Sequence, residues 1–282
     1  MANRRLDTVV AEKTNTSRSF ASKLIDDGKV RLKGEVLNKP SKKISDDADL
    51  KIDFNKNVKH AKLKLKVIYE DEDCLVVDKP SGILTHSKGA FNPEATLATW
   101  LHEKASSLDK DDQRSGIVHR LDRGTSGVIL LAKNENAQKH FQKQFAKRNV
   151  KKTYIALVEG LVNPPEAVID IPLARNSADP KRFKVSKFGK PAQTTYKILK
   201  TFTYQDKEYS EVELRPKTGR THQIRLHLKY LNKPIIGDDF YGGIEADRLY
   251  LHAAELEITM PDSTRKKFNS PLPKDFLKPK IN

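Results

Sequence analysis

The chain has 282 residues, with 53 lysines and arginines against 37 aspartates and glutamates, and a formal net charge of +16 at pH 7. Its single cysteine excludes an intrachain disulfide, and its longest interior apolar run, Val128–Ala132, is far too short to span a membrane. This charge excess is typical of proteins that bind nucleic acid, although a lysine-rich solvated surface produces it too. The first residues include no apolar leader segment, so we expect a soluble cytoplasmic protein.

Residues 1–54 have the pattern of a small unit of helices and short strands. Leu6, Val9 and Val10 are spaced so that they would share one face of a helix. Ser17 is placed to cap a second helix, because a serine just before an apolar-periodic segment is a common start signal. Short alternating strands are expected at residues 30–32, 36–37 and 50–54.

Basic side chains crowd the second of these helices and the turn that follows it. Residues 1–62 hold 15 lysines and arginines against 9 acidic residues, so this part carries +6 of the total charge. The polar, lysine-rich segment 55–66 is expected to be a linker. The basic residues that we expect to meet a polyanionic partner here are Arg18, Lys23, Lys29 and Arg31.

Residues 67–282 form a second, larger predicted domain in which strands outnumber helices. Because several predicted strands follow one another directly, the pattern favours an α+β fold with a mixed, largely antiparallel sheet and flanking helices. Helices are expected to follow the capping residues Thr96 and Asn134 and to span residues 221–231. The predicted strands cover residues 67–69, 75–77, 117–118, 128–132, 154–158, 168–171, 194–202, 212–215 and 249–258.

The densest polar cluster of this domain is residues 119–127, between two predicted buried strands. Asp122 stands between Arg120 and Arg123, and nearby positive charge favours the ionised form of a carboxyl group. An ionised carboxylate in a loop can act as a nucleophile or a base, or it can simply cap a turn. The flanking histidine and glycines make the segment distinctive, because Arg-Leu-Asp alone also occurs at residues 5–7.

Segment 119–127, His-Arg-Leu-Asp-Arg-Gly-Thr-Ser-Gly, resembles the signature loop of the RluA/RluD family of pseudouridine synthases. Further blocks that resemble motifs of this family occur in the expected order over residues 67–276. Residues 1–54 resemble the S4-type RNA-binding domain that often precedes this catalytic domain. The further blocks are residues 78–82, 152–160, 217–228, 234–238 and 251–253.

The resemblance implies an isomerase that flips specific uridines out of RNA and converts them to pseudouridine, with no cofactor and no metal. It implies that Asp122 is the catalytic aspartate, that Tyr154 lies against the uracil ring, and that Arg120 fills the gap left by the flipped nucleotide. Large-subunit ribosomal RNA, free or in pre-ribosomal particles, is the expected partner of a monomeric enzyme. Transfer RNA is the alternative substrate, and a non-catalytic RNA-binding or ribosome-assembly protein is the alternative class.

The last predicted helix bears two arginines with different expected roles. Ile224 and Leu228 would face inward, and Arg225 lies beside that face. Arg225 can therefore reach a buried carboxylate, and it is our candidate for the ionic partner of Asp122. Arg220 lies at the start of the helix and is expected to meet RNA phosphate or solvent.

Two further features concern possible ligands. Arg182 lies in the basic segment 175–187, where a loop of the family enters the groove of RNA, so we expect it to bind RNA. A solvated hairpin would have the same composition. His222 and His227 are five residues apart and would face different sides of a helix or a strand, which argues against a metal site.

Overall fold

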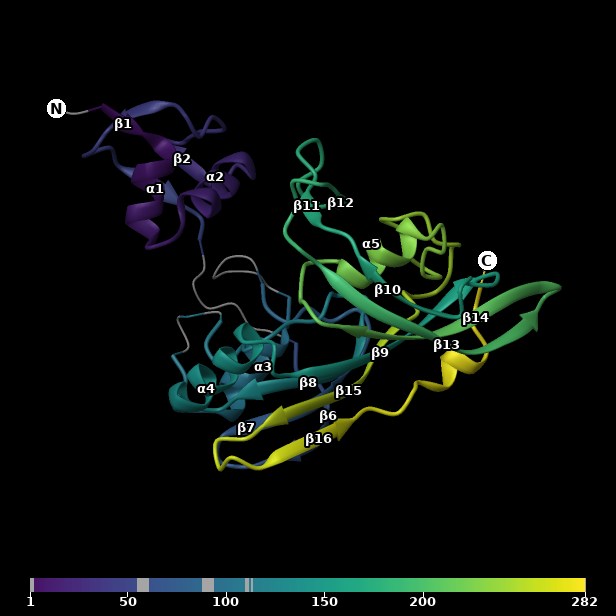
Figure 1. Ribbon diagram of the computed structural model, residues 1–282. Helices are drawn as coiled ribbons and strands as arrows, with labels where there is room; N and C mark the ends of the chain where they lie inside the picture. The colour runs from purple at the N-terminus through teal and green to yellow at the C-terminus, as the bar shows by residue number, and fades with distance from the viewer. Residues whose placement is uncertain (1–2, 55–60, 88–93, 110–111, 113, 282) are drawn as a thin grey trace. The chain divides into compact units, whose positions relative to one another are not determined.

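The computed structural model of the protein describes residues 3–54, 61–87, 94–109, 112 and 114–281. These residues form two compact units, one made mainly of residues 3–54 and the other of residues 63–86, 96–109 and 114–281 (Figure 1). Within the predicted linker, residues 55–60 lie outside the described residues. Among the residues that the structure describes, no helix is both long enough and apolar enough to cross a membrane.

In the smaller unit, two helices pack against short strands. Helices α1 (Leu6–Thr14) and α2 (Arg18–Asp26) form where predicted, and the Ser17 hydroxyl caps α2 by accepting a hydrogen bond from the Phe20 amide at 3.3 Å. The core includes the fully buried side chains of Leu6, Val10, Ala21, Ile25 and Val30. The strands are β1 (Asn3–Arg5) paired with β4 (Lys43–Ser45), and β2 (Val30–Leu32) between β3 (Glu35–Val36) and β5 (Leu50–Ile52).

The larger unit is built on a nine-stranded sheet with the order β10-β13-β14-β9-β15-β8-β7-β6, and β16 pairs with β15. Among the described strand pairs of this sheet only β8 and β15 run parallel, which confirms the predicted mixed, largely antiparallel sheet. The strands are β6 (Lys66–Glu70), β7 (Cys74–Lys79), β8 (Ser126–Ala132), β9 (Lys151–Glu159), β10 (Glu166–Asp170), β13 (Gln193–Tyr204), β14 (Lys207–Pro216), β15 (Leu251–Thr259) and β16 (Arg265–Asn269).

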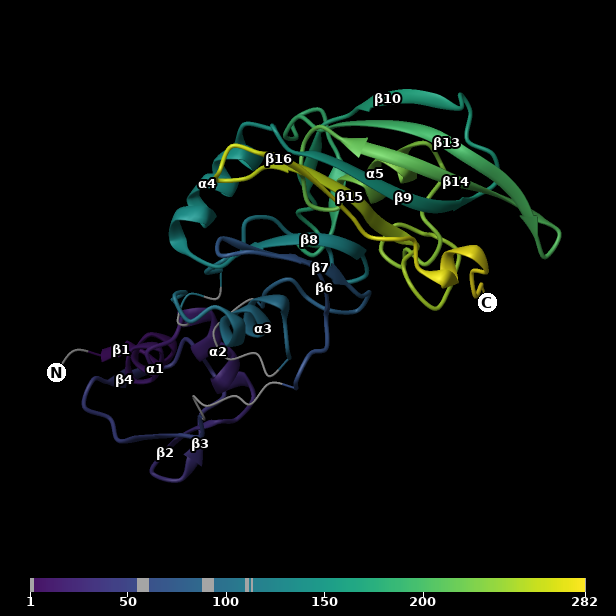
Figure 2. The same ribbon diagram turned by 90° about the horizontal axis from the view of Figure 1, so that it is seen from below.

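Helices pack on both halves of this sheet and create two cores. Helices α3 (Leu97–Lys104) and α4 (Glu135–Ala146) lie on the half with β7 and β8, and α5 (Gln223–Tyr230) lies on the half with β9 and β14 (Figure 2). Each helix buries apolar side chains together with those of its strands. Thr96 and Asn134 cap α3 and α4, as predicted. Tyr154 packs against both cores, so it lies where the two halves meet.

The predicted strand at residues 117–118 is wrong. Ile117 makes only an isolated bridge with Leu131. The preceding Gly116 has a φ of 79°, and the Ile117 amide donates a hydrogen bond back to the Arg114 carbonyl at 2.9 Å. The chain therefore turns at this point, and the two apolar residues are buried by the fold around them rather than by pairing in the sheet.

Several predicted boundaries shift, two of them near the last helix and the last predicted strand, and one hairpin lies apart from the large sheet. Helix α5 begins at Gln223 instead of residue 221, because His222 has a left-handed backbone with a φ of 56° that a helix cannot include. The last predicted strand begins at Leu251 instead of residue 249. Strands β11 (Leu173–Arg175) and β12 (Phe183–Val185) form the separate hairpin, and a short 3-10 helix spans Lys274–Leu277.

Gly127 gives a test of the parallel contact between β8 and β15. Its φ is 113°, and a Cβ added there would overlap the backbone of Ala253. We expect Gly127→Ala to lower the free energy of unfolding by at least about 2 kcal/mol, because it combines a strained backbone with overpacking. Urea unfolding measures the loss. In the control, Gly219→Ala, the added Cβ would meet nothing closer than 3.9 Å, and an equal loss in both variants would contradict this explanation.

Candidate active site

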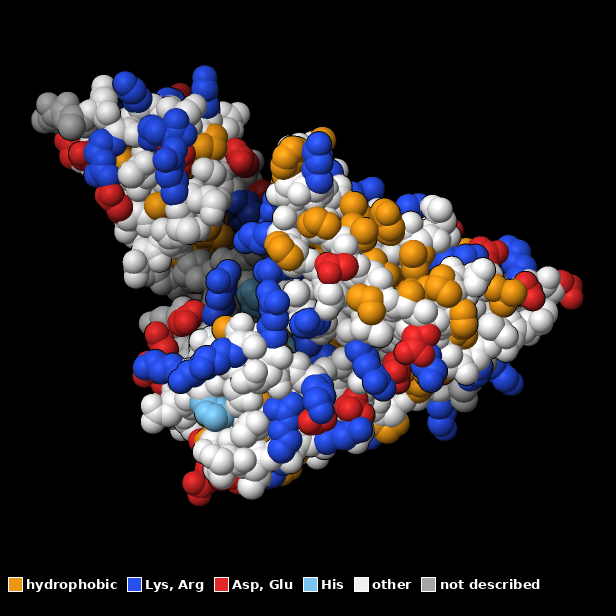
Figure 3. Space-filling view, viewed as in Figure 1, with side chains coloured by type: hydrophobic (Ala, Val, Ile, Leu, Met, Phe, Trp, Pro, Cys, Tyr) orange, Lys and Arg blue, Asp and Glu red, His pale blue; other side chains and the backbone are white. Residues whose placement is uncertain are grey.

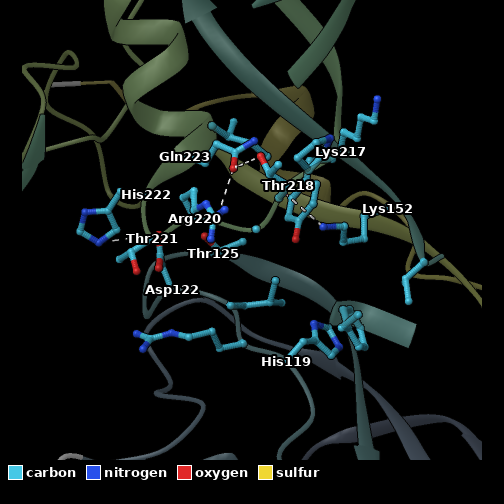
Figure 4. A pocket seen from close by; sticks show the side chains of 18 of the residues that line it. His119, Asp122, Thr125, Lys152, Lys217, Thr218, Arg220, Thr221, His222 and Gln223 are labelled. Carbon is cyan, nitrogen blue, oxygen red and sulfur yellow. Dashed lines mark hydrogen bonds and ion pairs between the residues drawn. The ribbon is translucent and has the colours of Figure 1, made fainter. Parts of the chain in front are cut away.

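Three segments of the larger unit form most of the wall of a cavity of about 410 Å³, and residues at the end of α4 and just after it, with Leu251, complete the wall (Figure 4). One is the loop 118–125 that leads into β8, the second is β9, and the third is segment 216–225, where β14 leads into α5. All three predicted catalytic side chains line this cavity, and so do two of the predicted RNA-binding arginines. These five residues are Asp122, Tyr154, Arg225, Arg120 and Arg220.

Asp122 faces Arg225, as the helical spacing predicts. Its carboxylate lies 3.6 Å from Nη1 of Arg225 and 3.9 Å from Nε2 of His222, and 19% of its side chain is exposed. A guanidinium stays protonated at any ordinary pH, so Asp122 has a permanent positive charge beside it. The carboxylate is still accessible from the cavity, as a reacting group must be.

Arg225 is held by a second carboxylate, Asp238, which the sequence analysis missed. Nε and Nη2 of Arg225 donate hydrogen bonds to Asp238 at 2.8 and 2.6 Å, and the Asp238 side chain is fully buried. Burial alone would lower the pKa of Arg225, but the hydrogen bonds and the charge of Asp238 outweigh burial and raise that pKa. The available signal was an acidic residue directly after the apolar segment 234–237.

His222 completes the surroundings of Asp122 from the start of α5. The Nδ1 atom of His222 lies 2.8 Å from the Tyr241 hydroxyl, which fixes the ring with Nε2 toward Asp122. Burial lowers the pKa of His222, so the ring is mainly neutral at pH 7. The ring nitrogens of His227 are engaged elsewhere, with the Thr194 hydroxyl and the Ile171 carbonyl. Within the described ranges no group of three or more potential metal ligands occurs.

The loop around Asp122 is fixed through its backbone carbonyls. The Thr85 hydroxyl donates to Leu121 O at 2.9 Å, and the Ser81 hydroxyl donates to Gly124 O at 2.7 Å. Lys79 is fully buried, and its ammonium donates to Arg123 O at 3.2 Å and to two carbonyls of its own segment. Burial lowers the pKa of Lys79 to about 7. Residues 79–85 therefore hold the backbone on both sides of Asp122.

His119 and Tyr154 enter the cavity as neutral rings. Nε2 of His119 accepts a hydrogen bond from the Leu130 amide at 3.0 Å, and its ring stacks on Phe145 with centroids 4.5 Å apart. Burial lowers the pKa of His119 to about 3. Burial, followed by the charge of Asp122, raises the pKa of the Tyr154 phenol above its usual range, so the hydroxyl keeps its proton.

The predicted RNA-binding arginines of the larger unit differ in their surroundings. The Arg120 side chain is exposed on the cavity lining. Nε of Arg220 donates to Pro191 O at 3.2 Å, which ties that side chain to the strand segment before β13. Arg182 does not line the cavity; it pairs with Asp179 at 3.3 Å and lies over the Phe240 ring at 5.5 Å.

The basic residues predicted to bind RNA on the smaller unit are surface side chains (Figure 3). Nε of Arg18 lies 3.1 Å from the buried Asp7 carboxylate, and Lys29 pairs with Asp53 at 2.9 Å. Asp7 also bonds to Arg5, and the pKa of Asp7 falls to about 2 because of the hydrogen bond from Arg5. Arg18 therefore has a structural task in addition to any contact with a ligand. Lys23 and Arg31 are exposed as well.

The Arg225–Asp238 pair makes a testable prediction for stability. We expect Arg225→Ala to cost about 3–5 kcal/mol of unfolding free energy, because it leaves a carboxylate buried without its partner. The double variant Arg225→Met, Asp238→Leu should lose less than the sum of the two single variants, since neither charge then remains unpaired. Arg220→Ala is the control and should cost less than about 1 kcal/mol. Additive losses in chemical denaturation would contradict the pairing.

Known proteins that resemble this chain point to one family. The sequence profile described as RNA pseudouridylate synthase matches residues 73–230, and the S4 domain profile matches residues 4–50. The chain is 39% identical over 244 residues to an uncharacterized RNA pseudouridine synthase of Aquifex aeolicus, with 84% of this chain and 77% of the relative covered. It is 38% identical over 254 residues to ribosomal large subunit pseudouridine synthase D of Borreliella burgdorferi, with 85% and 76% covered.

A solved structure agrees with the sequence comparisons. Human RNA pseudouridylate synthase domain containing 1 superposes with a TM-score of 0.62 at 28% identity, over 74% of this chain and 83% of the human chain. The profile match covers more than half of the sequence, and the relatives align over most of their own lengths. The protein therefore belongs to the RNA pseudouridylate synthases, a family of isomerases, and carries an S4 domain ahead of its catalytic domain.

Proposed function

We propose that this protein isomerises specific uridines of large-subunit ribosomal RNA, as a cytoplasmic monomer acting on free RNA or on pre-ribosomal particles. The RNA class is supported by relatives named ribosomal large subunit pseudouridine synthase D. Those of Borreliella burgdorferi and Vibrio parahaemolyticus are 38% and 32% identical, with 76% and 89% of their lengths covered.

We propose the same division of the chain that the sequence suggests. An S4-type domain comprises residues 1–54, a linker comprises residues 55–66, and the catalytic domain comprises residues 67–282. The S4 profile match ends at residue 50, and β6 begins at Lys66, which supports the two boundaries. RNA binding is thereby divided between a basic S4-type domain and a catalytic domain that is also basic.

The observation that carries the proposed site is the Asp122 carboxylate, 3.6 Å from Arg225 in a cavity of about 410 Å³. A cavity of this size accommodates a small ligand such as a single nucleotide. Flipping a base out of RNA costs a few kcal/mol, and a side chain that fills the gap offsets part of that cost. The exposed Arg120 on the cavity lining takes that role.

The chemistry uses the substrate's own base as leaving group and as returning nucleophile. The bond from N1 of uracil to C1′ of the ribose breaks, the ring turns, and C5 bonds to C1′; C5 then loses a proton and N1 gains one. Asp122 either attacks C1′ or removes the proton from C2′, and in both cases it acts as an ionised carboxylate. Arg225 holds Asp122 in place, and Tyr154 lies against the ring as a neutral phenol.

The Asp122 role can be tested in a strain that lacks the gene. Complementation with the wild type should restore pseudouridine at sites in large-subunit ribosomal RNA, and complementation with Asp122→Asn should not. In vitro we expect Asp122→Asn to lower the rate more than about 1000-fold, or about 4 kcal/mol of barrier, because the amide cannot act as nucleophile or base. Pseudouridine mapping of total RNA measures the first effect, and single-turnover assays measure the second.

Asp239→Asn is the matched control for this experiment. Its side chain is 84% exposed and lies 3.9 Å from Arg225, so it changes one nearby carboxylate without touching the proposed nucleophile. It should keep nearly full activity, and both variants should bind RNA with an affinity close to that of the wild type. If the wild type restored pseudouridine in transfer RNA alone, the proposal of a ribosomal substrate would be wrong, but the proposed reaction would stand.

The exposed basic residues of the S4-type domain lead to a prediction for the salt dependence of RNA affinity. We expect Lys23→Gln with Arg31→Gln to weaken RNA binding and to reduce the slope of log K against log salt by about 1.5, since each lost phosphate contact removes about 0.7 to 0.9. Fluorescence anisotropy with a ribosomal RNA fragment measures the slope. The control is Lys197→Gln with Lys207→Gln, on β13 and β14, which removes the same number of positive charges from the other domain. An unchanged slope in the Lys23 and Arg31 variant would show that these residues do not contact phosphate.

A further inference from the structure

Lys152 is a lysine of the cavity to which the sequence analysis assigned no role. It lies on β9 two residues before Tyr154, so both side chains point to the same face of the strand, and both line the cavity. Its neighbour Lys151 points to the other face, is exposed, and pairs with Glu257 at 3.2 Å. Figure 4 shows the Lys152 side chain directed toward Thr218 on the opposite wall.

The ammonium group of Lys152 has few partners. It donates a hydrogen bond to Thr218 O at 3.4 Å, near the outer limit for such a bond, and no carboxylate of the described residues lies within 4.0 Å of it. An ammonium has three protons to donate, so most of its hydrogen-bonding capacity is unused. Burial lowers the pKa of Lys152 to about 8, which reflects a cation without a counter-charge.

Two other lysines of this unit, buried or partly buried, show the contacts that a structural lysine makes. Lys79 donates to three carbonyl oxygens at 2.8 to 3.2 Å. Lys133 donates to Glu70 at 3.0 Å and to Asp71 O at 2.6 Å. Lys152 makes no comparable set of contacts, so packing of the fold does not explain a cation at this position. An anionic group that enters the cavity would supply the missing partner.

We propose that Lys152 is a catalytic residue that donates a hydrogen bond to a carbonyl oxygen of the uracil ring when the ring has detached as an anion. This inference rests on the proposed active site. When the bond between N1 and C1′ breaks, its electron pair stays with the ring and spreads over N1 and the two carbonyl oxygens. The proton remains on Lys152 throughout, and the electron pair of the ring forms the new bond from C5 to C1′.

The position of Lys152 favours the detached ring over the bound substrate. The carbonyl oxygens of attached uracil are neutral acceptors, whereas those of the detached ring share a full negative charge. A positively charged donor therefore binds the detached ring more strongly than attached uracil. An interaction that strengthens along the reaction lowers the reaction's barrier. Tyr154 holds the ring face beside Lys152, because the two residues alternate with Thr153 on one strand. Arg225 stays engaged with the carboxylates of Asp122 and Asp238.

The first experiment compares Lys152→Met with Lys151→Met in the full-length protein. The substrate is total RNA from a strain that lacks the gene, so the assay does not depend on which RNA is modified. We expect Lys152→Met to lower the single-turnover rate by about 100-fold, comparable with the loss of a donor to a developing anion. RNA affinity should change less than threefold. The melting temperature should not fall, because a buried charge without a partner is removed. Lys151→Met should keep its rate within threefold.

The second experiment is chemical rescue. Lys152→Ala opens space at the ammonium position, and methylammonium chloride should raise its rate at least fivefold over sodium chloride at equal ionic strength. The assignment requires both the loss and the rescue. A loss below tenfold, or a loss without rescue, overturns it. A wild-type protein that forms no pseudouridine in any RNA overturns the proposed function along with it, whereas modification of transfer RNA alone overturns only the ribosomal substrate.

Discussion

The buried pair between Arg225 and Asp238 is the interaction on which the active-site geometry depends. Asp238 also accepts hydrogen bonds from the amides of Phe240 and Tyr241 at 3.2 and 3.1 Å, so it ties the loop after residue 237 to α5. Two of the three guanidinium nitrogens are directed at Asp238, and Nη1 lies 3.6 Å from Asp122. A buried ion pair is a weak source of net stability, because desolvation opposes it. Its consequence here is that the Arg225 guanidinium is held in one orientation, with Nη1 toward Asp122.

The site spans the junction of the two cores, so its dimensions follow from how the halves of the sheet are joined. The loop that carries Asp122 leads into β8 and belongs to the first half, whereas Arg225 lies on α5 in the second. Tyr154 packs against both. Gly127 lets the backbones of β8 and β15 approach more closely than any side chain would permit. A change in this close contact would move the carboxylate relative to its arginine, since the two come from opposite halves.

The features that the sequence predicts are mostly local, and those it misses depend on distant contacts. The cap formed by Ser17 involves a residue only three positions away, and the period of the last helix places Arg225 beside the inward face, within reach of a buried carboxylate. The position of Asp238 after an apolar segment gives no hint of its partner, because Arg225 is thirteen residues away across the rest of α5 and the loop that follows. The apolar pair 117–118 has the same composition as a strand, and only the turn at Gly116 shows that it is not one. The proposed roles of Asp122 and Tyr154 came from the family resemblance and not from any pattern of spacing.

Arg225 and Lys152, two of the cations that line the cavity, have chemistries that suit different tasks. The negative charge lies on Asp122 before the reaction and passes to the uracil ring when the ring detaches. Arg225 suits the first task, since a guanidinium keeps its charge and can bond two carboxylates through a rigid fork. Lysine suits the second, because an ammonium on a flexible stem can follow a ring that turns over during the reaction. A single cation would have to leave the carboxyl group of Asp122 in order to follow the charge to the ring. Separate cations allow the carboxylate to keep its direction while the ring moves.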